Sequence, residues 1–176
     1  MYALHPEDNY TLDDIYALPN GERAELIDGK IYYMSSPGLT HQRILGYLYR
    51  KIADYIDAQN GTCEPFMAPF AVFLNEDSKN YVEPDLGVVC EPQKLTDQGC
   101  IGAPDWIVEI VSPSSRSMDY YKKLFKYRMS GVREYWVVDP DKQMITVYNF
   151  ERDDMSEYAF GENVPCGIWP DFTLKI

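Results

Sequence analysis

The sequence predicts an α/β fold in which a mixed β-sheet is flanked by helices, with an N-terminal hairpin and a β-rich C-terminal tail. Three observations predict it. Residues 105–139 have the pattern strand, helix, strand; residues 39–60 carry apolar residues at helical spacing; and Asp28-Gly29 separates two extended runs. Such alternation is typical of α/β proteins. No repeat, low-complexity segment or linker interrupts the 176 residues, so we expect one domain over 1–176.

The N-terminal part begins with a short predicted helix over 11–19, where Thr11 is the N-cap and Asp14 completes a capping box. The hairpin follows at "ERAELIDGKIYYMS", because Asp-Gly between extended runs favours a tight turn. Residues 39–60 then predict a long amphipathic helix that ends near Asn60-Gly61.

The central and C-terminal segments alternate between strands and connections. We expect strands at 68–74 and 84–90, a loop over 91–103, a strand at 105–112, a helix over about 117–130 that ends at Gly131, a strand at 133–139, and a meander through 143–160. The helix between the strands at 105–112 and 133–139 has a length that suits a right-handed parallel crossover.

The strand "DWIVEIVS" at 105–112 is apolar on both faces, with Trp106, Val108 and Ile110 on one and Ile107 and Val111 on the other. This pattern is typical of a strand in the middle of a sheet. Glu109 interrupts it. Burial of a lone carboxylate costs several kcal/mol unless a cation or a proton compensates. Two explanations remain open: a metal ion, or an ion pair with Arg116, Arg133 or a lysine.

Two more acids stand in strand-like stretches: Glu25 in the hairpin and Asp85 at the start of "DLGVVC". Carboxylates that converge from adjacent strands suit Mg²⁺ or Mn²⁺, and Asp85 with Glu109 forms such a candidate pair. The alternatives are a turn or capping role for Asp85 and an edge-strand position facing water for Glu25.

The predicted helix "SMDYYKKLFKYRM" is cationic. Its basic residues are Lys122, Lys123, Lys126 and Arg128. A helical wheel places Tyr121, Leu124 and Phe125 inward and the lysines outward, so periodicity does not single out Lys123. The helix directly follows the strand with Glu109, close enough for one lysine to reach that acid.

Composition limits the functional classes. A net charge of −12 disfavours a long footprint on a polyanion. The longest apolar runs are far shorter than a membrane span, and no signal peptide is visible, so we expect a cytoplasmic protein without membrane association. Four cysteines without a CxxC pair predict reduced, partly buried thiols rather than a structural zinc site.

The chain resembles the Uma-two family of "putative restriction endonucleases", a branch of the PD-(D/E)XK nuclease superfamily. The resemblance covers nearly the whole chain. It is carried by "ELIDGKIYYMSSPGLTHQRI", "VEPDLGVVC" and "GAPDWIVEIVSPSSRSMDYYKKLFKYRMSGVREYWVVDP". It implies a restriction-endonuclease-like sheet and a metal-dependent endonuclease acting on DNA.

The resemblance also implies roles for individual residues. Asp85 matches the superfamily's central metal-binding aspartate, Glu109 the acid of its (D/E)XK half, and Glu25 the family's N-terminal glutamate. The usual lysine position is occupied by Val111, and the family's lysine corresponds to Lys123 on the following helix.

Mg²⁺ or Mn²⁺ held by Asp85, Glu109 and the carbonyl of Ile110 would activate water and polarise the phosphate. In that scheme Lys123 would orient the water, and Glu25 could hold a second metal ion. His41 is a candidate phosphate or substrate contact, or simply a residue of the helix N-terminus.

The expected partners are DNA and a second copy of the chain. The 15 tyrosines and the apolar β-rich tail leave surface for a homodimer. Helix 116–128, with Arg43, Arg50 and Lys51, is the expected basic face. Two other functions remain open: a catalytically inactive module that binds DNA or protein, and a glycoside hydrolase that uses Asp85 and Glu109, which would need an aromatic-lined groove.

Overall fold

A six-stranded mixed sheet forms the centre of the protein, in the order β11-β10-β9-β8-β5-β3. A computed structural model describes residues 9–75 and 77–176. The strands are β3 (Glu64–Met67), β5 (Leu86–Val89), β8 (Trp106–Ile110), β9 (Glu134–Asp139), β10 (Met144–Asn149) and β11 (Asp154–Ala159). β8 and β9 run parallel, whereas the other neighbours are antiparallel. The predicted mixed α/β sheet is confirmed, as is the parallel pairing across the crossover helix.

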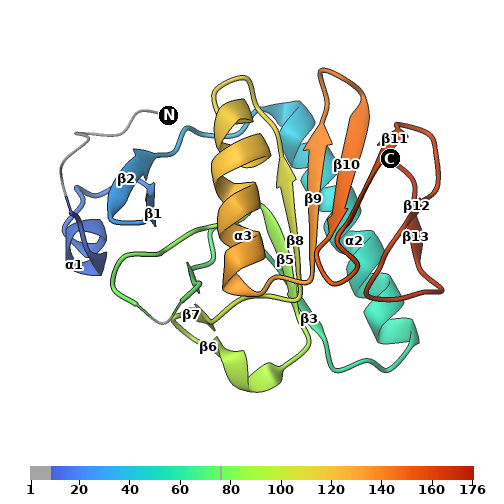
Figure 1. The fold of residues 1–176 in the computed structure, drawn as a ribbon, viewed down its shortest axis with the longest axis horizontal. Coiled ribbons are helices and arrows are strands. Elements are labelled where there is room, and N and C mark those ends of the chain that lie inside the picture. The colour runs from blue at the N-terminus through green and yellow to red at the C-terminus, as the bar shows by residue number, and fades with distance from the viewer. Residues whose placement is uncertain (1–8, 76) are drawn as a thin grey trace.

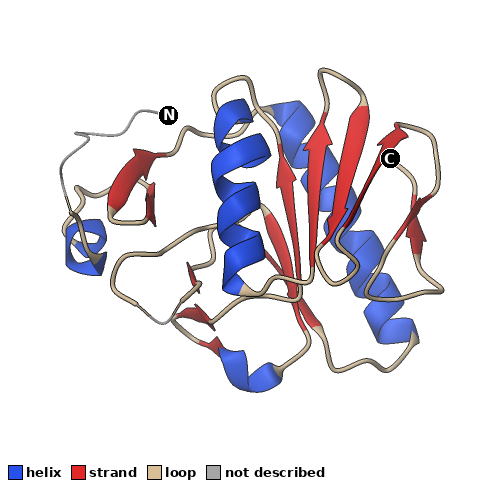
Figure 2. Ribbon diagram, viewed as in Figure 1, coloured by secondary structure: helices blue, strands red, loops and turns tan. Residues whose placement is uncertain are grey.

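One helix covers each face of the sheet (Figures 1 and 2). Helix α2 (Leu39–Ala58) lies behind the sheet in Figure 1, and α3 (Leu124–Ser130) lies in front of it. Strand β8 contributes to both cores: Trp106, Val108 and Ile110 pack in the cluster with α2, and Ile107 and Val111 pack on the α3 side. The predicted two-faced burial of this strand is therefore confirmed. By the same alternation Glu109 points toward the α3 side.

Helix α2 buries the apolar stripe that predicted it. Its buried residues are Ile44, Leu45, Leu48, Ile52 and Ile56. The chain leaves the helix through Asn60, whose φ is 50°. No helix within residues 9–75 and 77–176 combines the length and the apolarity that crossing a bilayer requires.

The N-terminal elements also match the prediction. Helix α1 (Leu12–Tyr16) starts after Thr11, whose backbone N–H donates to Asp14 Oδ2 at 2.8 Å. Strands β1 (Ala24–Ile27) and β2 (Lys30–Tyr33) form the hairpin. Its turn residues Asp28 and Gly29 have φ values of 50° and 73°, a conformation that a glycine adopts without strain. A bridge between Leu26 and Tyr81 fixes the hairpin beside the segment that leads into β5.

The short elements depart from the prediction in two places. The strand expected over 68–74 is only β4 (Val72–Phe73), because Pro69 has no N–H to donate to a ladder. The expected loop 91–103 contains η1 (Pro92–Lys94), β6 (Leu95–Thr96) and β7 (Gly99–Ile101), and β7 pairs with β4. The prediction of a β-rich tail, by contrast, is confirmed. After the β10–β11 meander, β12 (Val164–Pro165) pairs with β13 (Thr173–Leu174).

The crossover helix has the expected extent, and its predicted orientation holds for Leu124, which packs against the core, and for the exposed Lys122, but not for other residues. It begins with a π-helical segment, η2 (Met118–Lys123), continues as α3, and ends at Gly131 with φ 94°. The prediction that Tyr121 and Phe125 point inward is wrong, because they are 73% and 66% exposed, whereas Lys123 is buried. The wheel assumed an entirely apolar surface beneath the helix, but the helix covers the buried carboxylates of Glu25 and Glu109 as well as apolar residues.

The expectation of reduced thiols is wrong for two of the four cysteines. Cys63 and Cys90 form a disulfide, while Cys100 and Cys166 are free and buried. Cys63 directly precedes β3 and Cys90 directly follows β5, and these strands pair antiparallel with Glu64 opposite Val89. The next pair in that register is Cys63 with Cys90, so the sheet brings together two residues 27 positions apart.

Candidate active site

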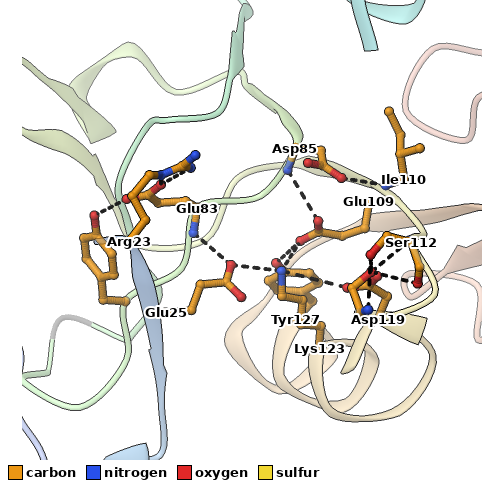
Figure 3. Close-up of polar contacts among 12 residues, drawn as sticks. Arg23, Glu25, Glu83, Asp85, Glu109, Ile110, Ser112, Asp119, Lys123 and Tyr127 are labelled. Carbon is orange, nitrogen blue, oxygen red and sulfur yellow. Dashed lines mark hydrogen bonds and ion pairs between the residues drawn. The ribbon is translucent and has the colours of Figure 1, made fainter. Parts of the chain in front are cut away.

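The four residues predicted to carry chemistry converge at one end of β8 (Figure 3). Glu25 comes from β1, Asp85 stands directly before β5, Glu109 lies in β8 and Lys123 ends η2. The β5–β8 register pairs Leu86 with Val108, which puts Asp85 opposite Glu109. Asp85, Glu109 and Lys123 line a cleft of about 370 Å³.

Lys123 joins two buried acids. Its Nζ lies 2.8 Å from Glu109 Oε1 and 2.9 Å from Glu25 Oε1. Lys123 and Glu109 are each 3% exposed, and Glu25 is fully buried. The ion pair with a lysine, left open as one explanation of Glu109, is therefore present. The expectation that Glu25 faces water is wrong, because the segment carrying Glu83 covers it and donates the Glu83 N–H to Glu25 Oε1 at 3.0 Å.

Burial and charge act in opposite directions on this cluster. Burial raises the pKa of the Glu109 carboxyl well above its usual range, and Lys123 opposes that shift only in part. Burial also lowers the pKa of Lys123, but the carboxylates of Glu109 and Glu25 outweigh it, so the pKa lies well above its usual value. Lys123 is therefore charged at neutral pH. The cluster has an excess of acids over this one ammonium, which favours a bound proton or a further cation.

Asp85 is held across the sheet rather than in a local turn. Its Oδ2 accepts a hydrogen bond from the Ile110 N–H at 2.7 Å and lies 3.0 Å from His41 Nε2. His41 stands in the first turn of α2 and also lines the cleft. Asp85 thus contacts the neighbouring strand, and this contact differs from the turn or capping role that was considered for it.

Two further residues belong to the cluster and were not predicted. The hydroxyl of Tyr127, on α3, donates to Glu109 Oε1 at 2.6 Å. Asp119, one helical turn before Lys123, is buried with its Oδ1 3.9 Å from Lys123 Nζ. Burial raises the pKa of Asp119 to about 7, against the attraction of Lys123. The spacing of four between Asp119 and Lys123 was visible in the sequence, but such spacing predicts an ordinary surface ion pair. It indicates a buried pair only when this face of the helix is known to point inward.

The acids fit a hard cation because each leaves one oxygen available. Within residues 9–75 and 77–176, Glu25 Oε2 is buried without a hydrogen-bond partner. Among these described residues, the side-chain contacts of Asp85 involve Oδ2 rather than Oδ1, and Glu109 Oε2 has a single long contact of 3.4 Å with the Asp85 N–H. No group of three or more His, Cys, Asp or Glu side chains in this part of the chain is arranged as a complete metal site. A cation here would therefore need backbone or solvent oxygens as well.

The cations of the crossover helix, expected to form part of a basic face, each have a partner within the described residues. Arg116 pairs with Asp139 and Asp141, Lys126 with Asp28, Arg128 with Asp153, and Lys122 donates to the Tyr32 hydroxyl. Arg133, considered as a partner of Glu109, pairs with Asp105 and Glu151 instead.

The glycoside hydrolase alternative is not favoured by the cleft. Within the described ranges, Tyr33 is the single aromatic residue that lines it. Stacking of a sugar needs a groove rich in aromatic residues. We therefore set this alternative aside.

The mixed sheet, its two helices and the acid–lysine cluster at the end of β8 define a protein with a restriction-endonuclease-like fold. The family model described as "Putative restriction endonuclease" (Uma2) matches residues 11–174. The chain belongs to this family, which confirms the resemblance to Uma-two proteins.

Comparison with individual proteins agrees with this assignment. A crystal structure described as "a putative nuclease belonging to DUF820" from Anabaena variabilis ATCC 29413 superposes with a TM-score of 0.76 over 94% of each chain, at 24% identity, and shows the same fold. Two Synechocystis sp. (strain ATCC 27184 / PCC 6803 / Kazusa) proteins are each 28% identical to the chain. "Uncharacterized protein slr1290" matches over 76% of this chain and 68% of its own length, and "Uncharacterized protein sll1609" over 67% of each.

Proposed function

We propose that the protein is a metal-dependent endonuclease that hydrolyses phosphodiester bonds in DNA. The observation that carries the proposal is the convergence of Asp85 and Glu109 on a cleft, with Lys123 bound to Glu109 at 2.8 Å. Membership of a restriction endonuclease family supports a nucleic acid as the substrate.

The proposed ion is Mg²⁺ or Mn²⁺. Asp85 and Glu109 would hold it through the oxygens they leave available, together with the main-chain carbonyl of Ile110. Such an ion polarises a phosphate and lowers the pKa of water. Ile110 also fixes Asp85 through its N–H, at 2.7 Å, so that one segment of β8 would orient both carboxylates.

The remaining residues would act on the substrate or hold the groups that do. The ammonium of Lys123 lines the cleft and would orient the attacking water and stabilise charge that develops on the phosphate oxygens. Glu25 holds Lys123 in place and has a second carboxylate oxygen for a further cation. His41 lines the cleft and would contact the phosphate there.

Binding of DNA must overcome the acidic balance of the chain. With a net charge of −12, the metal ion would supply much of the positive charge at the cleft. Arg43 is exposed on α2, two residues after His41, and would contact the DNA backbone beside the cleft.

A nicking assay on supercoiled plasmid tests the proposal. The parent protein is expected to cut the plasmid in the presence of Mg²⁺ or Mn²⁺ and to lose this activity when a chelator removes the ions. Asp85→Asn is expected to remain folded and to lose cutting by at least a hundredfold, and Glu109→Ala to lose it as well. Asp54→Asn, an exposed position on α2, is the matched control and should cut like the parent. Absence of metal-dependent cutting by the folded parent, or cutting by Asp85→Asn at the parent's rate, would refute the proposal.

A further inference from the structure

The crossover helix directs two donors at one carboxylate oxygen of Glu109. The Tyr127 hydroxyl donates to Glu109 Oε1 at 2.6 Å, and Lys123 Nζ lies 2.8 Å from the same oxygen. The two donors are four residues apart, so they lie on the same face of the helix, the buried one. Among the described residues, Glu109 Oε2 has a single long contact, at 3.4 Å from the Asp85 N–H. The donors therefore engage one oxygen and leave the other beside Asp85 (Figure 3).

The two donors differ in how firmly they can hold the carboxylate of Glu109. The ammonium of Lys123 is shared, because its Nζ also lies 2.9 Å from Glu25 Oε1 and 3.9 Å from Asp119 Oδ1. Lys123 also lines the cleft, where a bound phosphate would compete for it. A phenol has one O–H, and that of Tyr127 is committed to Glu109. The hydroxyl of Tyr127 is therefore the more specific of the two holds on Glu109.

The hydrophobic core fixes the position of this hydroxyl. Tyr127 is fully buried, and its ring packs against the equally buried ring of Tyr135, with centroids 5.0 Å apart and planes at 72°. The Tyr135 hydroxyl donates to the main-chain carbonyl of Asp119 at 3.0 Å, so this second ring is attached to the same helix. Close packing restricts the side-chain torsions of both rings. The hydroxyl oxygen of Tyr127 is thus held by the interior of the fold and not by the contents of the cleft.

We propose that Tyr127 is a positioning residue for the metal ion, which turns the Glu109 carboxylate so that Oε2 is the oxygen offered to the ion together with Asp85. This inference rests on the proposed metal-dependent function. Because Tyr127 is fully buried, it acts through Glu109 and does not touch the substrate. Carboxylates that bind metal ions are themselves held by hydrogen bonds, and loss of such a partner typically weakens metal binding about 10–100-fold. With Tyr127 in place, Lys123 can turn toward a substrate while Glu109 keeps its orientation.

Binding of Mn²⁺ to the protein without DNA, measured by isothermal titration calorimetry, tests the proposal. Tyr127→Phe removes the hydroxyl and keeps the ring, and it should raise the Mn²⁺ dissociation constant about 10–100-fold. Tyr135→Phe is the matched control, because it removes an equally buried hydroxyl that donates to the main chain of the same helix and not to a carboxylate. This variant should bind Mn²⁺ as the parent does. Circular dichroism confirms that both variants are folded, so a purely structural effect would appear in both.

The nicking assay gives a second measurement. Tyr127→Phe should need a correspondingly higher Mn²⁺ concentration for half-maximal cutting and should approach the parent's rate at saturation, whereas Asp85→Asn should stay inactive at every concentration. A folded parent that binds no Mn²⁺ would overturn the metal-dependent function together with this proposal. A parent that binds Mn²⁺, with Tyr127→Phe binding it equally well, would overturn this proposal alone. Equal weakening by Tyr127→Phe and Tyr135→Phe would do the same, because it would show a general effect of lost packing.

Discussion

Replacement of Lys123 by methionine removes the ammonium from the buried acid cluster and keeps most of the side-chain volume. Glu25 Oε1 and Glu109 Oε1 each lose a contact shorter than 3 Å. Removal of one partner from a buried ion pair costs about 3–5 kcal/mol, because the remaining charges stay desolvated. For a chain of this length, each kcal/mol corresponds to about 2–4 °C in Tm. We therefore expect Tm to fall by roughly 6–20 °C.

Urea unfolding followed by tryptophan fluorescence measures the effect, because Trp106 and Trp136 are fully buried. Lys51→Met, at an exposed position on α2, is the matched control and should change the unfolding free energy by less than about 0.5 kcal/mol. Addition of Glu25→Gln to the Lys123→Met variant should recover part of the loss, because one of the uncompensated carboxylates is then neutral. A loss for Lys123→Met no larger than that for Lys51→Met would refute the view that this ammonium stabilises the cluster.

Three further predictions concern single features of the fold. Tyr127→Phe removes a 2.6 Å hydrogen bond to the buried carboxylate of Glu109 and should lower the unfolding free energy by about 1.5–3 kcal/mol. A change below about 0.5 kcal/mol in urea unfolding would show that this hydrogen bond does not stabilise the fold. Burial raises the pKa of Asp119 from 3.8 to about 7, so between these pH values the native state binds a proton that the unfolded state releases. The unfolding free energy should therefore decline as the pH rises from 4 to 7, and Asp119→Asn should flatten that decline. A titration of the Asp119 carboxyl by NMR with its midpoint near 4 would contradict the raised pKa. Because Cys63 and Cys90 form a disulfide, alkylation of the unfolded, unreduced chain should label two thiols, and alkylation after reduction should label four. Four labelled thiols without reduction would show that the disulfide is absent.

Sequence patterns located the acids of the site because strands constrain their side chains strongly. Alternation along 105–112 placed Glu109 on one face of a buried strand, and Asp85 was expected beside it from an adjacent strand. The face on which Glu109 lies follows from a period of two, which a single sequence reveals. The position of Asp85 beside it depends on which strands pair, and the family resemblance supported that expectation.

The helix was harder to orient, since three of its large apolar side chains, Tyr121, Phe125 and Met129, are exposed to solvent. Periodicity assigns only apolar residues to the interior, but the interior beneath this helix contains Glu25 and Glu109, so Lys123 points inward as well. Only the family resemblance singled out Lys123, and Tyr127 carried no signal of its own. The Cys63–Cys90 bond was missed for a different reason: it depends on the register between β3 and β5, which the sequence does not encode locally.

The crossover helix contacts two different parts of the molecule: Lys123 is bound to Glu109, and Phe125, two residues later, lines a groove with Tyr148 of β10 and Met155 of β11. A turn of the helix about its own axis that withdrew the ammonium from the acids would swing the phenyl ring away from β10 as well. A molecule bound to the outer side of this helix would therefore also restrict the movement of Lys123 on its inner side.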